Sequence, residues 1–282
     1  MLATLVVFGG VITVTQISNA GDRRNRGGRP PATQCRPAPD GTAPSGQQNV
    51  TETRQNGRTV RNYWGDGQAC TTTPASPSPS TNEGEPNQPA PGTSSTTAPP
   101  PLDFGPDECS EGNGLDIHDG FQNGNRCVDT QMGEVANADQ NPTLLITSAP
   151  RSVGVNQPFT IRVSTRNLIR DRFLPAGQGG YYVDMSILND QNLVRGHFHS
   201  ACRELNNTNA APNPEPAPAF FVATEDNGGG AAPDVIEIRV PGLPNRGTFQ
   251  CASWAGDASH RIPMMQRANQ IPAFDAVRVT VR

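Results

Sequence analysis

Hydrophobic and polar residues alternate in short runs from residue 143 to residue 282, which is the period-two pattern of half-buried β-strands. In the run 158–165, Phe159, Ile161 and Val163 fall on one face and polar residues separate them. Turns rich in Gly, Pro and Asn divide the runs, and no stretch shows helical periodicity. The pattern predicts an all-β antiparallel sandwich of about seven or eight strands. The strands are expected at residues 143–148, 158–165, 180–188, 193–202, 218–223, 234–240, 247–254 and 275–282.

The first half of the chain differs in composition and lacks this alternation. Residues 71–102 are dominated by Pro, Ser and Thr, a composition that cannot bury a core. The residues before them show no sustained apolar alternation. Five parts are therefore predicted: a signal peptide at 1–20, an Arg-rich and poorly ordered segment at 21–70, a Pro/Ser/Thr-rich linker at 71–102, an acidic Asn/Gly-rich disulfide loop at 103–142 and the β-sandwich domain at 143–282.

The N-terminus has features of an export signal. The apolar run 2–14 is followed by Ser18-Asn19-Ala20, a small-x-small cleavage pattern. A run of about 13 residues is short for a membrane span, which needs about 20. We therefore expect a secreted or cell-surface protein with no stable membrane span after cleavage. Four arginines directly after the run favour retention of that flank in the cytoplasm and leave an uncleaved anchor as the alternative. They are Arg23, Arg24, Arg26 and Arg29.

Charge changes sign along the chain. Residues 21–70 carry eight arginines against four acidic residues, 71–142 one against eleven, and 143–282 thirteen against eleven. Such blocks indicate segments with separate roles. The net charge of −4 gives no reason to expect nucleic acid as a partner. The expected partner is an unidentified extracellular ligand or protein.

The six cysteines have no paired C-x-x-C spacing, which indicates disulfides and an oxidising compartment. The segment boundaries favour pairing in chain order. The expected pairs are Cys35–Cys70, Cys109–Cys127 and Cys202–Cys251. If the last pair forms, neither sulfur is available as a thiolate ligand, which argues against a copper site of the His-Cys-Met type.

Two family resemblances support this interpretation. The stretch "IEIRVPGLPNRGTFQCASWAG" resembles part of fibronectin type III and other immunoglobulin-like domains, which implies a sandwich of that type. Phe249, two residues before Cys251, stands where that family has a corner tyrosine, and it lacks the hydroxyl. Residues 103–282 also resemble exported actinobacterial proteins of unassigned function, through "FQNGNRCVDT", "STRNLIRDRFLPAGQGGYY", "RGHFHSACR" and "WAGDASHRIPMMQRANQ". That resemblance implies export and no particular activity.

The stretch "RGHFHSACRE" contains the best candidate for chemistry. Residues i and i+2 of a strand share a face, about 6.5 Å apart, so His197 and His199 could chelate one cation. We expect these two imidazoles to point outward and Phe198 and Cys202 to point into the core. An outward His-x-His pair is, however, also common as a plain polar surface.

A metal site needs a third ligand, and His260 is the expected one. It lies in the long connection before the last strand, and connections of that length are often functional. Glu204 and Asp257 are further candidates that would offer oxygen to a harder ion. Imidazole ligands make a transition metal (zinc, copper or iron) the expected cofactor.

Two enzyme families on β scaffolds share part of this pattern. Intradiol ring-cleaving dioxygenases have a strand of the type Arg-x-x-His-x-His, which "RGHFH" resembles with the arginine one position off. The resemblance implies Tyr182, His197 and His199 as iron ligands, but the earlier second tyrosine of that family has no counterpart between residues 64 and 180. Cupins have His-x-His followed by Glu, which "HFHSACRE" resembles through His197, His199 and Glu204, without the motif's glycines.

The neighbouring stretch "RNLIRDRFLPAGQGGYY" contains Arg166, Arg170 and Arg172 beside a Gly-rich turn. These arginines could hold an anionic ligand, or they could be solvated or paired with aspartates. His118 is expected to be a solvent-exposed residue of the acidic loop. The sequence thus predicts an exported, non-catalytic sandwich module, with a secreted metal-binding protein or non-heme metal oxidoreductase as the alternative.

Overall fold

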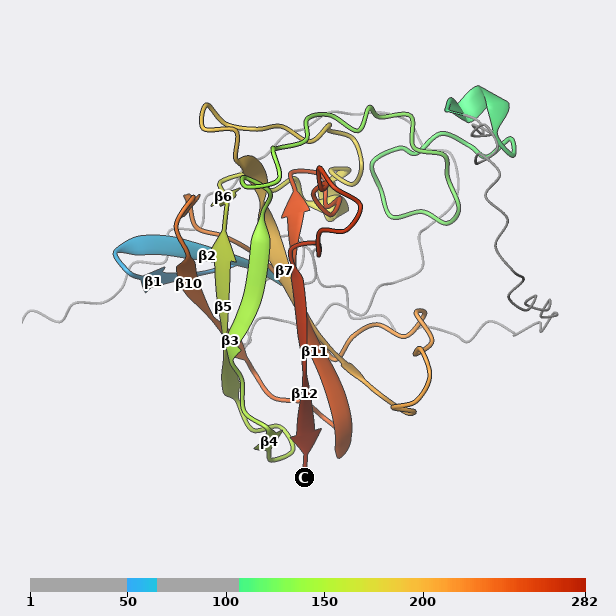
Figure 1. Ribbon diagram of the computed structural model, residues 1–282. Helices are drawn as coiled ribbons and strands as arrows, with labels where there is room; N and C mark the ends of the chain where they lie inside the picture. The colour runs from blue at the N-terminus through green and yellow to red at the C-terminus, as the bar shows by residue number, and fades with distance from the viewer. Residues whose placement is uncertain (1–49, 65–106) are drawn as a thin grey trace, which may run out of the picture.

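Two β-sheets pack face to face in the computed structural model, which describes residues 50–64 and 107–282 (Figure 1). The larger sheet has the strand order β1-β2-β8-β7-β11-β12-β4, with β6 and β9 attached beside β7, and the smaller sheet has the order β10-β5-β3. The strands are β1 (Val50–Gln55), β2 (Arg58–Trp64), β3 (Thr143–Ser148), β4 (Ser152–Val153), β5 (Phe159–Arg166), β6 (Leu168–Arg170), β7 (Val194–Glu204), β8 (Phe220–Glu225), β9 (Gly228–Gly230), β10 (Asp234–Val240), β11 (Gly247–Asp257) and β12 (Phe274–Val281). Two 3₁₀ turns, η2 (Cys109–Glu111) and η3 (Ala176–Gln178), complete the regular structure of the described ranges.

The predicted antiparallel sandwich of immunoglobulin-like type is confirmed. Its central strands follow the C-F-G order of that architecture in β7-β11-β12 and the opposing sheet in β10-β5-β3. The alternation seen in the sequence sets which side chains enter the core. Ile161 and Ile238 of the small sheet face Phe198 and Phe249 of the large sheet, and all four are almost completely buried.

Cys202 and Cys251 form the expected disulfide in the middle of this core. The two residues lie directly opposite each other on β7 and β11, with a Cα–Cα distance of 4.0 Å. The disulfide therefore ties two neighbouring strands of one sheet. Both sulfurs are buried, and neither can serve as a metal ligand.

Seven of the eight expected strands are present, and the one at 180–188 is wrong. Residues 181–188 are irregular, with isolated bridges at Ser186 and Leu188. Apart from these bridges, the segment forms no ladder with a neighbouring strand. Its backbone donates instead to Gly120 O and Ser259 O, from Tyr181 N and Tyr182 N respectively.

The expectation of poor order over residues 21–70 is wrong for residues 50–64. These form the hairpin β1–β2, and β2 extends the large sheet by pairing with β8. Val60, Asn62 and Trp64 are buried on one face of β2, so a polar Asn in the middle hid the alternation. The signal segment 1–20, the linker 71–102 and the pair Cys35–Cys70 lie outside the described residues.

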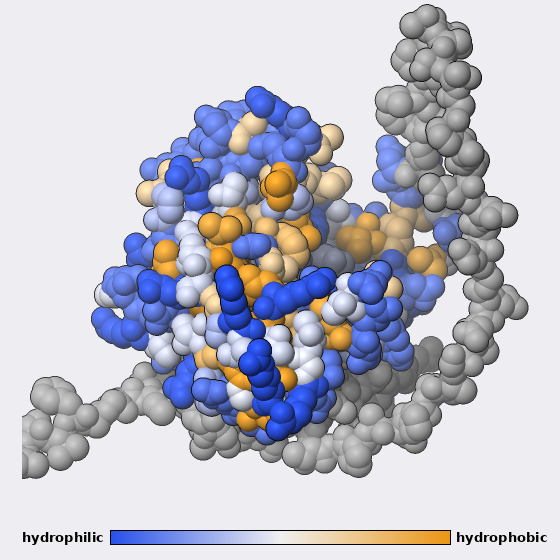
Figure 2. Space-filling view, turned by 60° about the horizontal axis from the view of Figure 1, so that its bottom comes forward, coloured by the Kyte–Doolittle hydropathy of each residue, from blue (hydrophilic) through white to orange (hydrophobic). Residues whose placement is uncertain are grey.

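The acidic segment is a disulfide-closed loop that packs on the sandwich, as expected. Cys109 and Cys127 are bonded, and Gly133 bridges to Ser186 of the irregular segment. The end of the sandwich that carries β4 shows hydrophobic and hydrophilic side chains interspersed, as on an ordinary solvent-exposed surface (Figure 2). Within the described ranges, no helix has the length and apolar character needed to cross a membrane.

Candidate metal centre

His197 and His199 lie on the face of β7 that points away from the sandwich core. Their direct neighbours on β11 are Gly256, opposite His197, and Trp254, opposite His199. A Cβ on Gly256 would lie 3.1 Å from His197 Nε2 and 3.3 Å from His199 Cε1. The absence of a side chain at this position therefore leaves room for the two imidazoles to lie side by side above the sheet.

His260 reaches the same place from a tight turn at the end of β11. Asp257 builds the turn, because its Oδ1 accepts hydrogen bonds from the backbone N–H groups of Ser259 and Arg261, each at 3.0 Å. Its main-chain oxygen accepts from His260 N at 3.1 Å. His260 has a φ of 74°, in the left-handed region that non-glycine residues rarely adopt. The turn thus holds the residue in a strained conformation, and such conformations cluster at functional sites.

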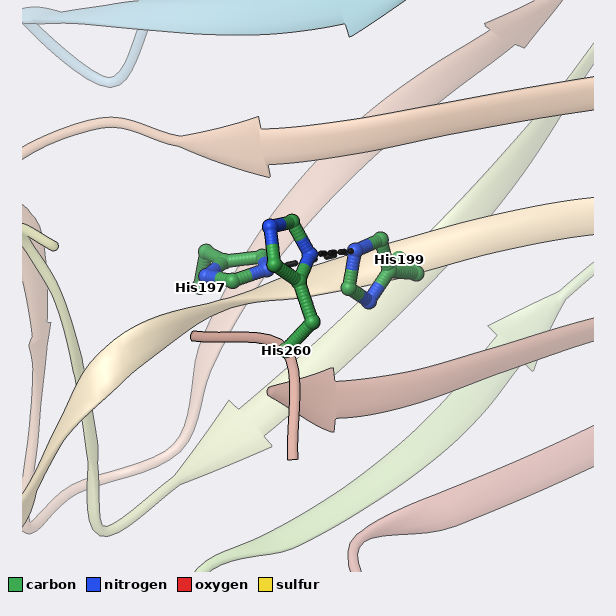
Figure 3. A group of neighbouring side chains, drawn as sticks. All are labelled: His197, His199 and His260. Carbon is green, nitrogen blue, oxygen red and sulfur yellow. Dashed lines mark hydrogen bonds between the residues drawn. The ribbon is translucent and has the colours of Figure 1, made fainter. Parts of the chain in front are cut away.

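The three imidazoles converge on one point (Figure 3). His199 Nε2 lies 3.2 Å from His197 Nε2 and 3.2 Å from His260 Nδ1, and all three nitrogens are within 4.8 Å of one another. A tetrahedral ion with metal–nitrogen bonds of about 2.0 Å has ligand–ligand edges of about 3.3 Å. The two separations measured from His199 Nε2 therefore match the spacing of ligands around a single metal ion.

Backbone carbonyls fix which nitrogens point inward with lone pairs. His197 Nδ1 lies 3.1 Å from Arg172 O, and His260 Nε2 lies 2.6 Å from Leu174 O. Because a carbonyl oxygen only accepts, both of these ring nitrogens must carry the hydrogen. His197 Nε2 and His260 Nδ1 then face each other and His199 as lone pairs. This is the arrangement of metal-binding histidines, which donate their other N–H to a carbonyl or carboxylate.

His199 cannot satisfy this arrangement by hydrogen bonding alone. Its Nε2 has at most one hydrogen to share between two neighbouring lone pairs. Its Nδ1 is buried and has no hydrogen-bond partner among the described residues. A cation at the point of convergence accepts all three lone pairs at once.

The histidines are buried, which corrects the expectation of an outward, solvent-facing pair. His197, His199 and His260 are 0%, 3% and 7% exposed. The segment 171–184 covers them: Arg172 N donates to Gly196 O and Leu174 N donates to Ala258 O, so this segment is fastened to both β7 and the turn after β11. Phe198 and Cys202 do point into the core as expected.

Burial and proximity keep the imidazoles of His197 and His199 neutral. Burial, together with the neighbouring His260, lowers the pKa of His197 to about 3. Burial and the charges of both neighbours lower the pKa of His199 well below its usual range. Neutral imidazole is the form that binds metal, so His197 and His199 are presented as competent ligands at neutral pH.

Aromatic rings enclose the cluster. Phe173 contacts His197 and His260 edge to face, with ring centroids 4.9 and 5.3 Å apart. His199 lies near-parallel to two neighbouring rings, those of Phe221 at 5.4 Å and Trp254 at 5.2 Å. The histidines are therefore surrounded largely by aromatic rings, and the only ligand atoms that converge there, among the described His, Cys, Asp and Glu residues, are the three imidazole nitrogens.

The two candidate oxygen ligands do not join the cluster. Glu204 is five residues beyond His199 on β7, about 17 Å along the strand, and accepts a hydrogen bond from Asn245. This removes the cupin-like ligand set. The side chain of Asp257 is committed to its own turn and to Arg261, whose Nε lies 2.9 Å from Oδ2. Asp257 positions His260 rather than offering a ligand.

The dioxygenase-like ligand set also finds no support. The ring of Tyr182 packs against Tyr181 and His118, and its hydroxyl lies 3.1 Å from the Tyr181 hydroxyl. Tyr181, not Tyr182, contacts His260, at a ring-centroid distance of 5.4 Å. His118 is half-buried beneath this tyrosine pair rather than fully exposed, and its Nδ1 accepts a hydrogen bond from Gly120 N.

Sequence reasoning missed the groups that hold the histidines in place. They are the carbonyls of Arg172 and Leu174, the ring of Phe173 and the small surface of Gly256. The sequence contains a local hint in "RDRFLP", where Phe173 stands between Arg172 and Leu174, shortly before a proline. Nothing in the sequence shows, however, that this segment folds over a strand about 25 residues further along the chain.

Asp257→Ala tests the role of the turn. Alanine removes the carboxylate that accepts the hydrogen bonds from Ser259 N and Arg261 N, so the turn should loosen and His260 should leave its place. Loss of such supporting groups typically costs 10- to 100-fold in metal affinity, and we expect a loss of about that size in a competition titration against a chromophoric chelator. Glu204→Ala removes a carboxylate from the same sheet and should leave the affinity unaltered. Equal affinities of the two variants would contradict the assigned role.

Comparison with known proteins gives one match. A family model described as the CLU5d N-terminal domain matches residues 145–282, which run from within β3 to the end of β12 and include all three clustered histidines. No curated protein and no solved structure matches the chain significantly. The match covers most of the sandwich but not the hairpin β1–β2, and its description states no activity.

Proposed function

We propose that this chain is an exported β-sandwich protein in which His197, His199 and His260 bind one transition-metal ion. The single observation that carries the proposal is the convergence of three buried imidazole nitrogens, with His199 Nε2 lying 3.2 Å from both His197 Nε2 and His260 Nδ1. Zinc, copper and iron are the metals that imidazole ligands suit. The binding of an extracellular partner is compatible with this function, and the geometry of the three histidines supports the metal site.

Export is supported by cysteine chemistry and by the N-terminal sequence. The disulfides Cys109–Cys127 and Cys202–Cys251 indicate an oxidising compartment. The apolar run at residues 2–14, followed by a small-x-small pattern, favours secretion or display at the cell surface.

Metal analysis of the purified protein tests the proposal. Protein made without a histidine tag, loaded with zinc or copper and freed of excess ion, should retain about one ion per chain. His197→Ala/His199→Ala should retain none, since one remaining imidazole cannot hold the ion. A saturating ion should also raise the free energy of unfolding of the wild type by about 4 kcal/mol when its concentration is 1,000 times Kd.

His118→Ala is the matched control, because His118 is the one histidine outside the cluster. It should retain the ion as the wild type does. Substoichiometric metal in the wild type, or equal retention by the double variant, would overturn the proposed function.

A further inference from the structure

The charge balance of the site indicates which ion it holds, an inference that rests on the proposed function. Among the described His, Cys, Asp and Glu residues, the cluster contains three imidazoles, which bind metal in their neutral form, and no carboxylate or thiolate. The two acidic candidates are placed elsewhere, and the nearest cysteines form a disulfide. The ligand set therefore contributes no negative charge to offset that of the ion.

The charged residues around the site are neutralised in pairs. Arg261 lies 2.9 Å from Asp257 in the turn that carries His260, and Arg195 of β7 lies 2.9 Å from Asp171. In the covering segment, Arg172 pairs with Asp184. Each pair has zero net charge, so the site's surroundings add no carboxylate that is left to balance a cation.

An ion bound here must be buried with its charge uncompensated. The electrostatic cost of moving an ion from water into an apolar interior rises with the square of its charge, so a divalent ion costs about four times as much as a monovalent one of similar size. The enclosing rings of Phe173, Phe221 and Trp254 make these surroundings apolar. Among the metals that suit imidazole, copper is the one with an ordinary monovalent state.

We propose that the three-histidine centre holds copper as the cuprous ion, Cu(I), in preference to Zn(II) and Cu(II). Three nitrogen ligands satisfy Cu(I), which accepts low coordination numbers and needs no anionic ligand. A site that binds Cu(I) more tightly than Cu(II) raises the reduction potential of the bound copper. The protein would then carry copper in its reduced form through an oxidising compartment.

Paired titrations test this preference with the tag-free full chain. Cu(I) affinity is measured anaerobically by competition with bicinchoninate, and Zn(II) affinity by competition with a fluorescent zinc chelator. We expect Cu(I) to bind at least 100-fold more tightly than Zn(II). A smaller ratio overturns the cuprous preference and leaves the metal site standing, whereas failure to bind either ion overturns the proposed function itself.

Electron paramagnetic resonance gives an independent readout. Protein loaded with Cu(II) is treated with ascorbate, which gives one electron to each of two copper ions and is oxidised to dehydroascorbate with release of protons. The Cu(II) signal should disappear and stay absent for an hour in air after ascorbate is removed. Prompt return of the signal would show that the site does not stabilise Cu(I), and would overturn the inference.

A charge placed beside the site separates the electrostatic argument from a general effect of mutation. Phe221 stacks on His199, and Phe221→Glu and Phe221→Gln put side chains of the same shape there with and without a charge. Phe221→Glu should lower the ratio of Cu(I) to Zn(II) affinity at least tenfold relative to Phe221→Gln. Equal ratios in the two variants would contradict the role assigned to the missing negative charge.

Discussion

Replacing Cys202 and Cys251 together by alanine should lower the free energy of unfolding by about 4 kcal/mol. The disulfide closes a loop with a sequence separation of 49 residues, and the chain-entropy estimate for such a loop gives about this value. Both residues are completely buried, so the loss of two sulfurs from the core adds to the entropic effect. The midpoint of thermal unfolding should fall by roughly 8 to 16 °C.

Denaturant titrations of Cys202→Ala/Cys251→Ala and of the wild type measure the difference in the free energy of unfolding. Cys109→Ala/Cys127→Ala is the comparison, because its loop has a separation of 18 residues and its sulfurs lie outside the core. The same estimate gives about 3 kcal/mol for that loop. A loss below 1 kcal/mol for the core pair would show that β7 and β11 hold together without their covalent link.

The variant also tests how the metal centre depends on the sheet. β7 and β11 pair continuously from the Phe249–Glu204 end to the Asp257–Gly196 end, and the disulfide lies near the Phe249–Glu204 end, away from the histidines. The histidine end of the strands is held separately by the covering segment. Metal affinity should therefore be retained while global stability falls.

The sandwich could be predicted because its strands obey one simple rule. A half-buried strand must alternate, and Phe159, Ile161 and Val163 do so over a solvated opposite face. The rule fails where a segment is covered on both sides or lies across strand ends. Residues 181–188 alternate without pairing, and β2 pairs although Asn62 interrupts its apolar face.

The candidate site could be predicted only in part. Strand geometry placed His197 and His199 on one face, and the scarcity of histidines pointed to His260. Their burial could not be foreseen, because it depends on segment 171–184 folding back over β7. The role of Asp257 was misjudged for a similar reason: a carboxylate near histidines looks like a ligand until its hydrogen bonds to its own turn are known.

Arg170→Met is the second change with a large expected effect, a loss of about 3 to 5 kcal/mol in the free energy of unfolding. Arg170 is completely buried on β6, and its guanidinium makes two hydrogen bonds to Asp226, at 2.8 and 2.9 Å, and one to Asp234 at 2.8 Å. Of the two alternatives that the sequence left open for Arg170, an external anion or pairing with aspartates, the structure supports the pairing. Removing it leaves the carboxylate of Asp226, which is itself buried, without its partner.

A surface ion pair provides the matched control. Arg126 pairs with Asp116, whose side chain is 82% exposed. Arg126→Met makes the same replacement, and exposed pairs contribute about 1 kcal/mol or less. Denaturant titrations of the two variants should therefore differ by at least 2 kcal/mol, and similar losses would contradict the importance of burial.

Arg170→Met should also weaken metal binding. This effect would distinguish an arginine that only stabilises the fold from one that also holds the metal centre in place. The carbonyl of Arg170 accepts hydrogen bonds from Asp226 N and Asn227 N, which fixes the chain where the covering segment begins. Two residues later, the carbonyl of Arg172 accepts the hydrogen bond from His197. Loosening the anchor should therefore reduce metal affinity in the folded variant, whereas Arg126→Met should not. Adding Asp226→Leu to Arg170→Met removes the unpaired charge and should recover part of the stability, and recovery of metal affinity with it would trace both effects to the same buried pair.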